Sequence, residues 1–252
     1  LEGSYAILAL HEGENKIVAA RCGSPLVIGV SKDCYFAASD IPAFLEYTKN
    51  VVYLYDYDMV VLGSSLKILN LMEGGEVTRP IDTVDWDVEQ AKRGEFNHFM
   101  LKEIFEQVET IQRAAQQDVK IVEKVAQTMK NAKGIFLVGC GSSYHACLSA
   151  SYIFSKVAGL HVNVVLGSEF LNYEHFLTDE TLVIAVSQSG ETADVLEAVK
   201  TAKERGSKVI SIVNVTGSSL IRHSDTFLML HAGPEICVLS TKTYTSQLAL
   251  LS

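Results

Sequence analysis

The fold of this chain is decided by 181-TLVIAVSQSGETADVLEAVKTAKERG-206, which joins an apolar run to a helical one. The run 181–186 is apolar along nearly its whole length, which is typical of a strand buried on both faces. Residues 191–206 carry apolar side chains at helical spacing. Between them, 187-SQSGET-192 places small hydroxyl side chains in a short turn. A strand, a turn and a helix in this order form the repeating unit of a parallel α/β sheet.

The same order recurs on both sides of this stretch. Further strands are predicted at 134–139, 161–167, 208–214 and 226–230, and a further helix at 144–159. Right-handed crossovers between parallel strands place helices on both faces of the sheet. The sequence therefore predicts a flavodoxin-like, doubly wound α/β domain, in which ligands bind beyond the carboxyl ends of the strands.

The N-terminal part has the periodicity of an antiparallel sheet. Apolar runs at 5–10, 16–21, 26–30 and 34–39 alternate with short polar turns, and 51–63 is predicted to form two strands bent around residues 56–58. Asp40 as an N-cap and Pro42 in the first turn predict one short helix within 40–50. Consecutive hairpins of this kind indicate an antiparallel sheet.

A linker and a helical segment are predicted between these two parts. Residues 82–96 lose periodicity and begin with the acidic stretch 82–89, which we interpret as a solvated linker. Apolar residues recur at helical spacing from Phe99 to Lys130, with a break near 116–118, and this pattern predicts two helices. The predicted domains are therefore 1–81, 82–132 and 133–252.

Composition argues against several classes of function. The 252 residues are 48% apolar and 20% charged, which is typical of a protein that buries a full core. A net charge of −9 and the lack of a basic run argue against a nucleic-acid partner. The apolar runs are far shorter than the roughly 20 residues that cross a bilayer, and the first residues lack the positive charge of a secretory signal. We expect a cytoplasmic protein with no membrane partner, five reduced cysteines and no metal site.

Three loops rich in serine and threonine follow predicted strands at the edge where ligands bind. They are 139-GCGSSY-144, 187-SQSGET-192 and 214-NVTGSS-219. Backbone N–H groups at a helix N-terminus favour an anion, and short hydroxyl side chains add donors without crowding it. The loops predict a phosphate site, and N-capping of an ordinary helix is the alternative for any one of them. ATP and NAD are disfavoured, because no lysine follows the glycines and the third glycine of the dinucleotide fingerprint is absent.

Several ordered segments together resemble a known family. The segments 135-IFLVGCGSSYHACLSASYIF-154, 182–206, 212-IVNVTGSSLIRHSD-225 and 233-GPEICVLSTKTYTSQL-248 resemble the first sugar isomerase (SIS) domain of the glutamine:fructose-6-phosphate amidotransferase family. Upstream, 1-LEGSYAI-7, 20-ARCGSPLVIGV-30 and 36-FAASDIPAFL-45 resemble the later part of its Ntn-hydrolase-type glutaminase domain, and 93-RGEFNHFMLKEIFEQ-107 resembles its linker. The chain departs from the family at Val108, where a proline is common, and at Ser142, where a threonine is common. The likeness runs through nearly the whole chain.

This resemblance implies an activity and a set of binding residues. The family transfers the amide nitrogen of glutamine to fructose 6-phosphate, giving glucosamine 6-phosphate and glutamate, without a metal or organic cofactor. By this likeness, the substrate-binding residues would be Gly141, Ser142, Ser143, Ser187, Gln188, Ser189 and Thr192, with the backbone of Val238 and Ser240 on the other side of the sugar. The resemblance also implies that the full-length protein binds glutamine and forms a homo-oligomer, namely a dimer.

No catalytic residue is assigned within the chain. A glutaminase of this type needs an N-terminal cysteine, whereas residue 1 is Leu, so we expect the nucleophile upstream and no glutaminase activity from the chain as given. The isomerase acid and base would come from segments beyond Ser252. Glu191 is interpreted as a helix-end dipole partner and Lys242 as a solvated or interface charge. The chain is therefore expected to bind a hexose phosphate weakly without converting it.

Two other functions are compatible with the same sugar site. One is a non-catalytic regulator that senses a sugar phosphate through its SIS domain, and the other is a related deglycase acting on glycated amines. The glutaminase-like residues 1–80 favour the amidotransferase over a regulator, which would carry a different segment there.

Overall fold

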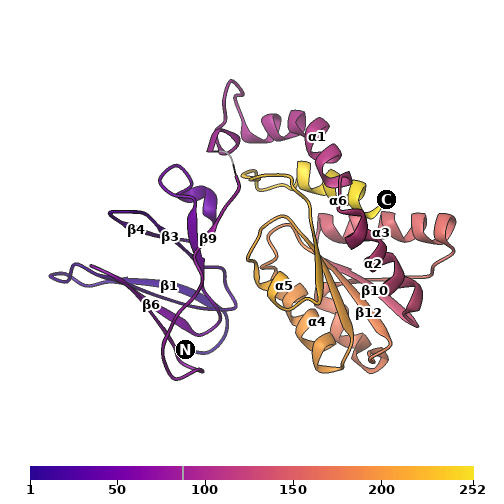
Figure 1. Cartoon of the computed structure of the whole chain (residues 1–252), viewed down its shortest axis with the longest axis horizontal. Coiled ribbons are helices and arrows are strands. Elements are labelled where there is room, and N and C mark those ends of the chain that lie inside the picture. Colours follow the sequence, from indigo (N-terminus) through magenta and orange to yellow (C-terminus); the bar gives the residue numbers. More distant parts are fainter. Residues whose placement is uncertain (87) are drawn as a thin grey trace. The chain divides into compact units, whose positions relative to one another are not determined.

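The computed structural model describes residues 1–86 and 88–252 and divides into two compact units, Leu1–Ala91 and Lys92–Ser252 (Figure 1). Each unit is described by itself. Asp87, within the acidic stretch predicted to be a linker, lies outside the described residues. Within the described ranges, no helix combines the length and the apolar character needed to span a membrane.

The first unit contains antiparallel sheets, as the hairpin pattern predicts. One sheet has the order β1 (Tyr5–Leu10), β2 (Ile17–Cys22), β6 (Asp58–Leu62), β7 (Leu66–Asn70) and β8 (Gly75–Val77), and another has the order β4 (Tyr35–Ala38), β3 (Val27–Val30), β5 (Asn50–Tyr53) and β9 (Asp82–Thr83). Their inward side chains form one apolar cluster that includes Ile28, Leu54 and Val60. The edge strand β1 lies largely exposed on both faces.

Two elements of the first unit differ from the prediction. The helix expected within 40–50 is a single 3₁₀ turn, Ile41–Ala43, whose first N–H donates to the Asp40 carboxylate at 2.8 Å, as the N-cap assignment predicts. Residues 82–83, predicted to open the linker, form β9 and pair with β5. The unit then continues through the short 3₁₀ helix η2 (Val88–Ala91).

The second unit contains the predicted parallel sheet. Its order is β11 (Asn163–Leu166), β10 (Gly134–Gly139), β12 (Thr181–Val186), β13 (Lys208–Val213) and β14 (Thr226–Met229), and each neighbouring pair is parallel. Numbered along the domain, this order is 2-1-3-4-5, which is the flavodoxin-like arrangement. The prediction of a flavodoxin-like parallel sheet is confirmed.

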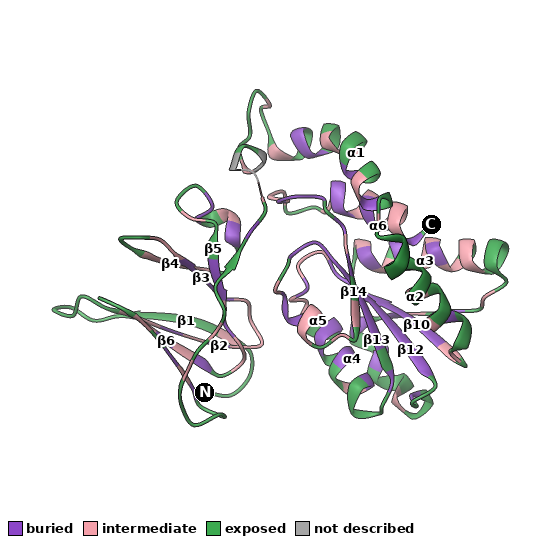
Figure 2. Ribbon diagram, viewed as in Figure 1, coloured by how far each residue is buried: buried purple, intermediate pink, exposed green. Residues whose placement is uncertain are grey.

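Helices cover both faces of this sheet, which is why its strands are apolar on both sides. One face packs against α2 (Val119–Asn131), α3 (Ser142–Ile153) and α6 (Lys242–Leu251), and α3 runs on into the π-helical turn η3 (Phe154–Ala158). The other face packs against η4 (Gly167–Phe176), α4 (Ala193–Glu204) and α5 (Ser219–Arg222). Figure 2 shows the buried strands between these two layers of helices.

The two helices expected between Phe99 and Lys130 are present as α1 (Phe99–Ala115) and α2. However, α1 packs against α6 with its polar side, which buries Lys102, Glu103 and Thr110. Its apolar residues Ile104 and Val108 are 43% and 70% exposed. The apolar spacing therefore predicts the helix correctly, whereas the face that packs within this unit is the charged one.

Candidate functional site

The candidate site lies where β10 and β12 run side by side in the centre of the sheet. β10 leads through Cys140 and Gly141 into α3, on one face, and β12 leads through 187–192 into α4, on the other face. In the flavodoxin-like order, the place where the connections of two neighbouring strands leave to opposite faces of the sheet is the switch point, and ligands bind there. The structure therefore brings two of the three predicted hydroxyl loops to one place.

The loop after β12 is held in shape by its own serine side chains. The buried Ser187 Oγ accepts the N–H of Gly190 at 3.0 Å and lies 3.0 Å from the Thr192 hydroxyl oxygen. Ser189 Oγ accepts the N–H of Glu191 at 3.1 Å. Hydroxyl oxygens thus accept two of the loop's backbone N–H groups. The Ser187 and Thr192 hydroxyls share one hydrogen bond, which leaves one of their two protons free to donate.

Both helices that begin at this site start without a side-chain cap. Thr192 at the N-cap of α4 and Gly141 at the N-cap of α3 make no side-chain hydrogen bond to the first turn in the described structure. Gly141 has φ of 56°, and a Cβ built there would meet nothing within 4 Å. The first turns of α3 and α4 thus keep backbone N–H groups that no N-cap side chain accepts, and a helix N-terminus of this kind favours an anion.

Ser143 is buried in the first turn of α3, and its hydroxyl is oriented by a helix far along the chain. Gln247 on α6 donates its side-chain N–H to Ser143 Oγ at 3.0 Å, and both residues are buried. Because Oγ already accepts this bond, the Ser143 hydroxyl proton is left to donate. Ser142, one residue earlier, is half-buried at the helix start.

The third predicted loop, 214–219, is occupied by the protein's own carboxylate. Glu191 accepts the backbone N–H of Ser219 at 2.6 Å and its hydroxyl at 2.9 Å, at the start of α5. This confirms the interpretation of Glu191 as a helix-end dipole partner, although it caps α5 rather than its own helix. The loop after β13 is thus closed to an external anion at this helix end.

The segment 233–241, which contains the predicted sugar contacts Val238 and Ser240, is tied to the same sheet by Asn214. The Asn214 side chain donates to the carbonyl of Gly233 at 2.7 Å and accepts the N–H of Ala232 at 2.9 Å. Further along, Val238 is fully exposed, and Ser240 Oγ lies 2.8 Å from Thr243 Oγ1 on α6. Thr243 and Gln247 are one turn apart on α6, so this helix connects the Ser240 and Ser143 positions.

Of the two interpretations of Lys242, a solvated or an interface charge, the structure contradicts the first, because Lys242 is only 1% exposed and lies between α6 and α1. Its ammonium group lies 2.6 Å from the carboxylate of Glu106, which also pairs with Lys102 at 2.8 Å. Burial raises the pKa of Glu106, but the hydrogen bonds from Lys102 and Lys242 outweigh it, so that the pKa is lowered. This partly buried ion pair joins α1 to α6.

The cysteines nearest the site are poor nucleophiles. Burial raises the pKa of the Cys140 thiol, between β10 and Gly141, and it raises the pKa of Cys147 in α3 to about 12. Both remain protonated thiols at neutral pH. Within the described residues, no cluster of His, Cys, Asp and Glu has the arrangement of a metal site.

Sequence reasoning missed four residues that shape the site. Asn214 and Gln247 orient the loops, and two buried or partly buried carboxylates, Glu103 and Glu235, accept hydrogen bonds from the segment 236–243. A buried glutamate cannot be distinguished from a solvated one by sequence spacing alone. Placing Glu103 requires knowing which side of α1 is buried.

Comparison with known proteins gives a family match for most of the second unit. Residues 128–252 match the family model described as SIS domain. The whole chain is 43% identical to a glutamine-fructose-6-phosphate aminotransferase (isomerizing) from Thermococcus kodakarensis and 42% identical to one from Methanothermobacter thermautotrophicus, and it spans 42% of the length of each.

The solved structures agree with the family model. The C-terminal domain of glucosamine-fructose-6-phosphate aminotransferase from Francisella tularensis is 36% identical, with a TM-score of 0.58 over 64% of this chain and 47% of that one. A putative phosphosugar isomerase from Silicibacter pomeroyi is 32% identical, with a TM-score of 0.53 over 61% of this chain and 49% of that one. Residues 128–252 of this protein therefore match the SIS domain family in sequence, and the parallel sheet fits the fold of its solved relatives.

Proposed function

We propose that this chain is part of a glutamine-fructose-6-phosphate aminotransferase (isomerizing), and that its SIS domain binds the phosphate and the sugar of fructose 6-phosphate. The parent reaction transfers the amide nitrogen of glutamine to fructose 6-phosphate and gives glucosamine 6-phosphate and glutamate. The names of the relatives that match the whole chain support this proposal. The regulator and the deglycase are not favoured, because the relatives match residues 1–91 as well as the SIS domain.

One observation carries the proposed binding site: two uncapped helix N-termini flank the switch point of the sheet, with the hydroxyl loop 187–192 between β12 and α4. The phosphate would sit at these helix ends, with Ser143, Ser187, Ser189 and Thr192 donating to its oxygens. Gln188, Ser142, the backbone of Val238 and Ser240 would contact the sugar. No residue of the described chain is assigned to the proton transfers.

The remaining assignments follow from the same proposal. The antiparallel sheets of the first unit support its assignment as the later part of an Ntn-hydrolase-type glutaminase domain over 1–81, followed by a linker and helical segment over 82–132 and the sugar domain over 133–252. The full-length protein would be a cytoplasmic homodimer that takes up glutamine through its N-terminal part. Sedimentation of the full-length protein tests the dimer.

Calorimetric titration of the whole chain with fructose 6-phosphate tests the proposed site. We expect saturable binding that weakens about tenfold or more in Thr192→Ala and in Ser189→Ala, because each removes a hydroxyl beside the bound phosphate. The matched control is Thr201→Ala, which alters a hydroxyl later in α4 and should leave the affinity unchanged. The proposed site is wrong if the folded chain shows no saturable binding, or if both variants bind as the parent does.

A further inference from the structure

The segment 236–241 presents its predicted sugar contacts on an exposed tip. Val238 is 100% exposed and Leu239 is 61% exposed. A tip in solvent gains little from apolar burial, so its conformation depends on the hydrogen bonds at its two ends. What holds those ends therefore decides where the backbone of Val238 and the hydroxyl of Ser240 lie.

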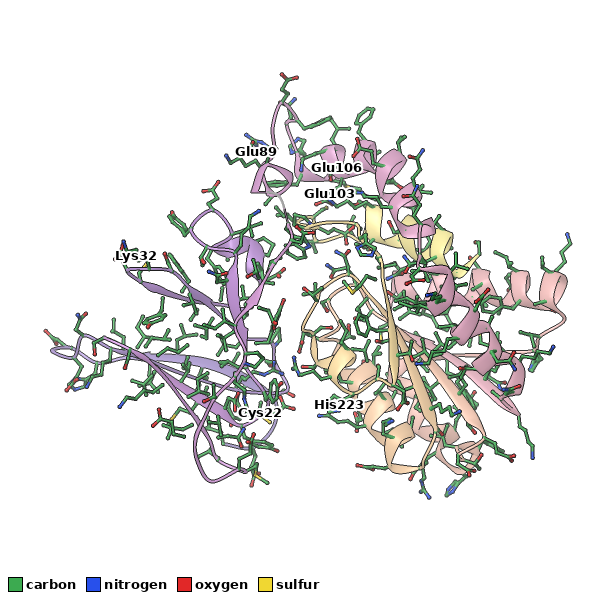
Figure 3. The ribbon with its side chains drawn as sticks, in the orientation of Figure 1. Cys22, Lys32, Glu89, Glu103, Glu106 and His223 are labelled. Carbon is green, nitrogen blue, oxygen red and sulfur yellow. The ribbon has the colours of Figure 1, made fainter. Side chains whose placement is uncertain are left out.

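One carboxylate, that of Glu103 on α1, holds both ends of this tip. Its Oε1 accepts the backbone N–H of Ile236 at 2.7 Å and of Cys237 at 2.9 Å. Its Oε2 accepts the hydroxyl proton of Thr241 at 2.7 Å. Figure 3 shows Glu103 and Glu106 on α1 beside the loop that leads into α6. A single side chain thus joins residue 237 to residue 241 across the tip.

The surroundings of Glu103 make this clamp stiff. The residue is 2% exposed, and hydrogen bonds to a carboxylate are about twice as strong as those between neutral groups. Glu235 reinforces the C-terminal end of the tip, since its Oε1 accepts the N–H of Thr241 at 2.9 Å and of Thr243 at 3.1 Å. Next to it, the partly buried ion pair of Lys242 and Glu106 joins α1 to α6.

We infer that Glu103 is a positioning residue for sugar recognition, which fixes the tip 238–240 against the sugar while leaving the phosphate loop 187–192 untouched. This inference rests on the proposed function. It also extends the site beyond the SIS domain, because α1 precedes the matched residues 128–252. Binding of the phosphate group and binding of the sugar would then depend on different parts of the chain.

This division predicts a split between two ligands. Glu103→Gln keeps the shape of the side chain but removes its charge and turns an NH₂ group toward hydrogen-bond donors. Calorimetry with the whole chain should show an affinity for fructose 6-phosphate reduced about tenfold or more, and an affinity for inorganic phosphate changed by less than about twofold. Glu109→Gln, on the exposed side of the same helix, is the control and should change neither affinity.

The outcomes separate this inference from the proposed function. If the parent chain does not bind fructose 6-phosphate, the proposed function fails and the inference with it. If the parent binds and Glu103→Gln binds equally well, or loses sugar phosphate and inorganic phosphate in parallel, the inference alone is wrong. A merely structural role for Glu103 would give the parallel loss.

A milder variant covers the case in which Glu103→Gln does not fold. Thr241→Val removes the hydroxyl that donates to Glu103 and keeps the shape of the side chain. We expect a smaller version of the same split. The affinity for fructose 6-phosphate should fall about threefold, because a single hydrogen bond is lost. Faster amide hydrogen exchange at Ile236 and Cys237 in either variant would report the loosened clamp directly, and unchanged exchange in both would contradict it.

Discussion

Two serine-rich loops follow neighbouring strands of the SIS sheet. One ends at a helix without a side-chain cap, and the other ends at a helix that a carboxylate caps. The loop 187–192 leads into α4, whose N-cap residue makes no side-chain hydrogen bond to the first turn in the described structure. The loop 214–219 leads into α5, whose first N–H is bound by Glu191 from the other loop. Similar composition therefore does not give a similar role, because a carboxylate placed between the two loops closes one of them.

The two loops also touch at one glycine. Gly190 has φ of 67°, and a Cβ built on it would lie 2.3 Å from Ser218 Oγ and 2.6 Å from Ser218 Cβ. In addition, the Gly190 carbonyl accepts the N–H of Leu220 on α5 at 3.0 Å. The open loop and the closed loop are thus packed as one structure, and changes at their contact test whether they depend on each other.

The largest effect is expected from Gly190→Ala. The methyl group would need both a left-handed backbone and the space filled by Ser218, so we expect a loss of about 2–4 kcal/mol in the free energy of unfolding. Urea denaturation of the whole chain measures it. Gly13→Ala is the matched control, because Gly13 has φ of 87° with nothing within 4 Å of its Cβ position, and it should lose only about 1 kcal/mol. Equal losses in the two variants would show that the loops are not packed as described.

A smaller effect is expected from Glu191→Gln, which uncaps the closed loop. The neutral amide makes weaker hydrogen bonds to Ser219 and no longer complements the helix end, so stability should fall by about 1–2 kcal/mol. Glu197→Gln, on the exposed side of α4, is the control and should have little effect. Equal stability of the parent and Glu191→Gln in urea would mean that the cap contributes nothing.

The smallest effect is expected from Ser218→Ala, which is compared with the same substitution in the other loop. Ser187→Ala leaves the buried N–H of Gly190 without its acceptor and should cost about 1–2 kcal/mol. Among the described residues, the buried Ser218 hydroxyl has no hydrogen-bond partner, so Ser218→Ala should change stability by less than about 0.5 kcal/mol. Thermal unfolding of both variants measures the difference. A larger loss for Ser218→Ala than for Ser187→Ala would reverse the comparison.

Much of the fold could be predicted because its signals are local. Uninterrupted apolar runs such as 181–186 mark strands buried on both faces, and the turn residues between hairpins mark the antiparallel part. The helix α6 was not predicted, although it carries Thr243 and Gln247, because its apolar periodicity is short and polar side chains fill its buried face. For the same reason, the sequence left open whether Lys242 is a solvated or an interface charge.

By itself, the sequence determined most of the strands and helices of the parallel sheet, and that hydroxyl-rich turns follow β10, β12 and β13. Apolar periodicity and helix-capping chemistry are properties of neighbouring residues, so they can be read directly from the chain. Only the tertiary structure decided which of these turns stays open. Glu191, Glu103 and Gln247 each act on a residue 28 to 138 positions away. Whether a carboxylate caps a helix, clamps a loop or faces solvent depends on which elements pack against it, because a buried charge is stable only where donors surround it.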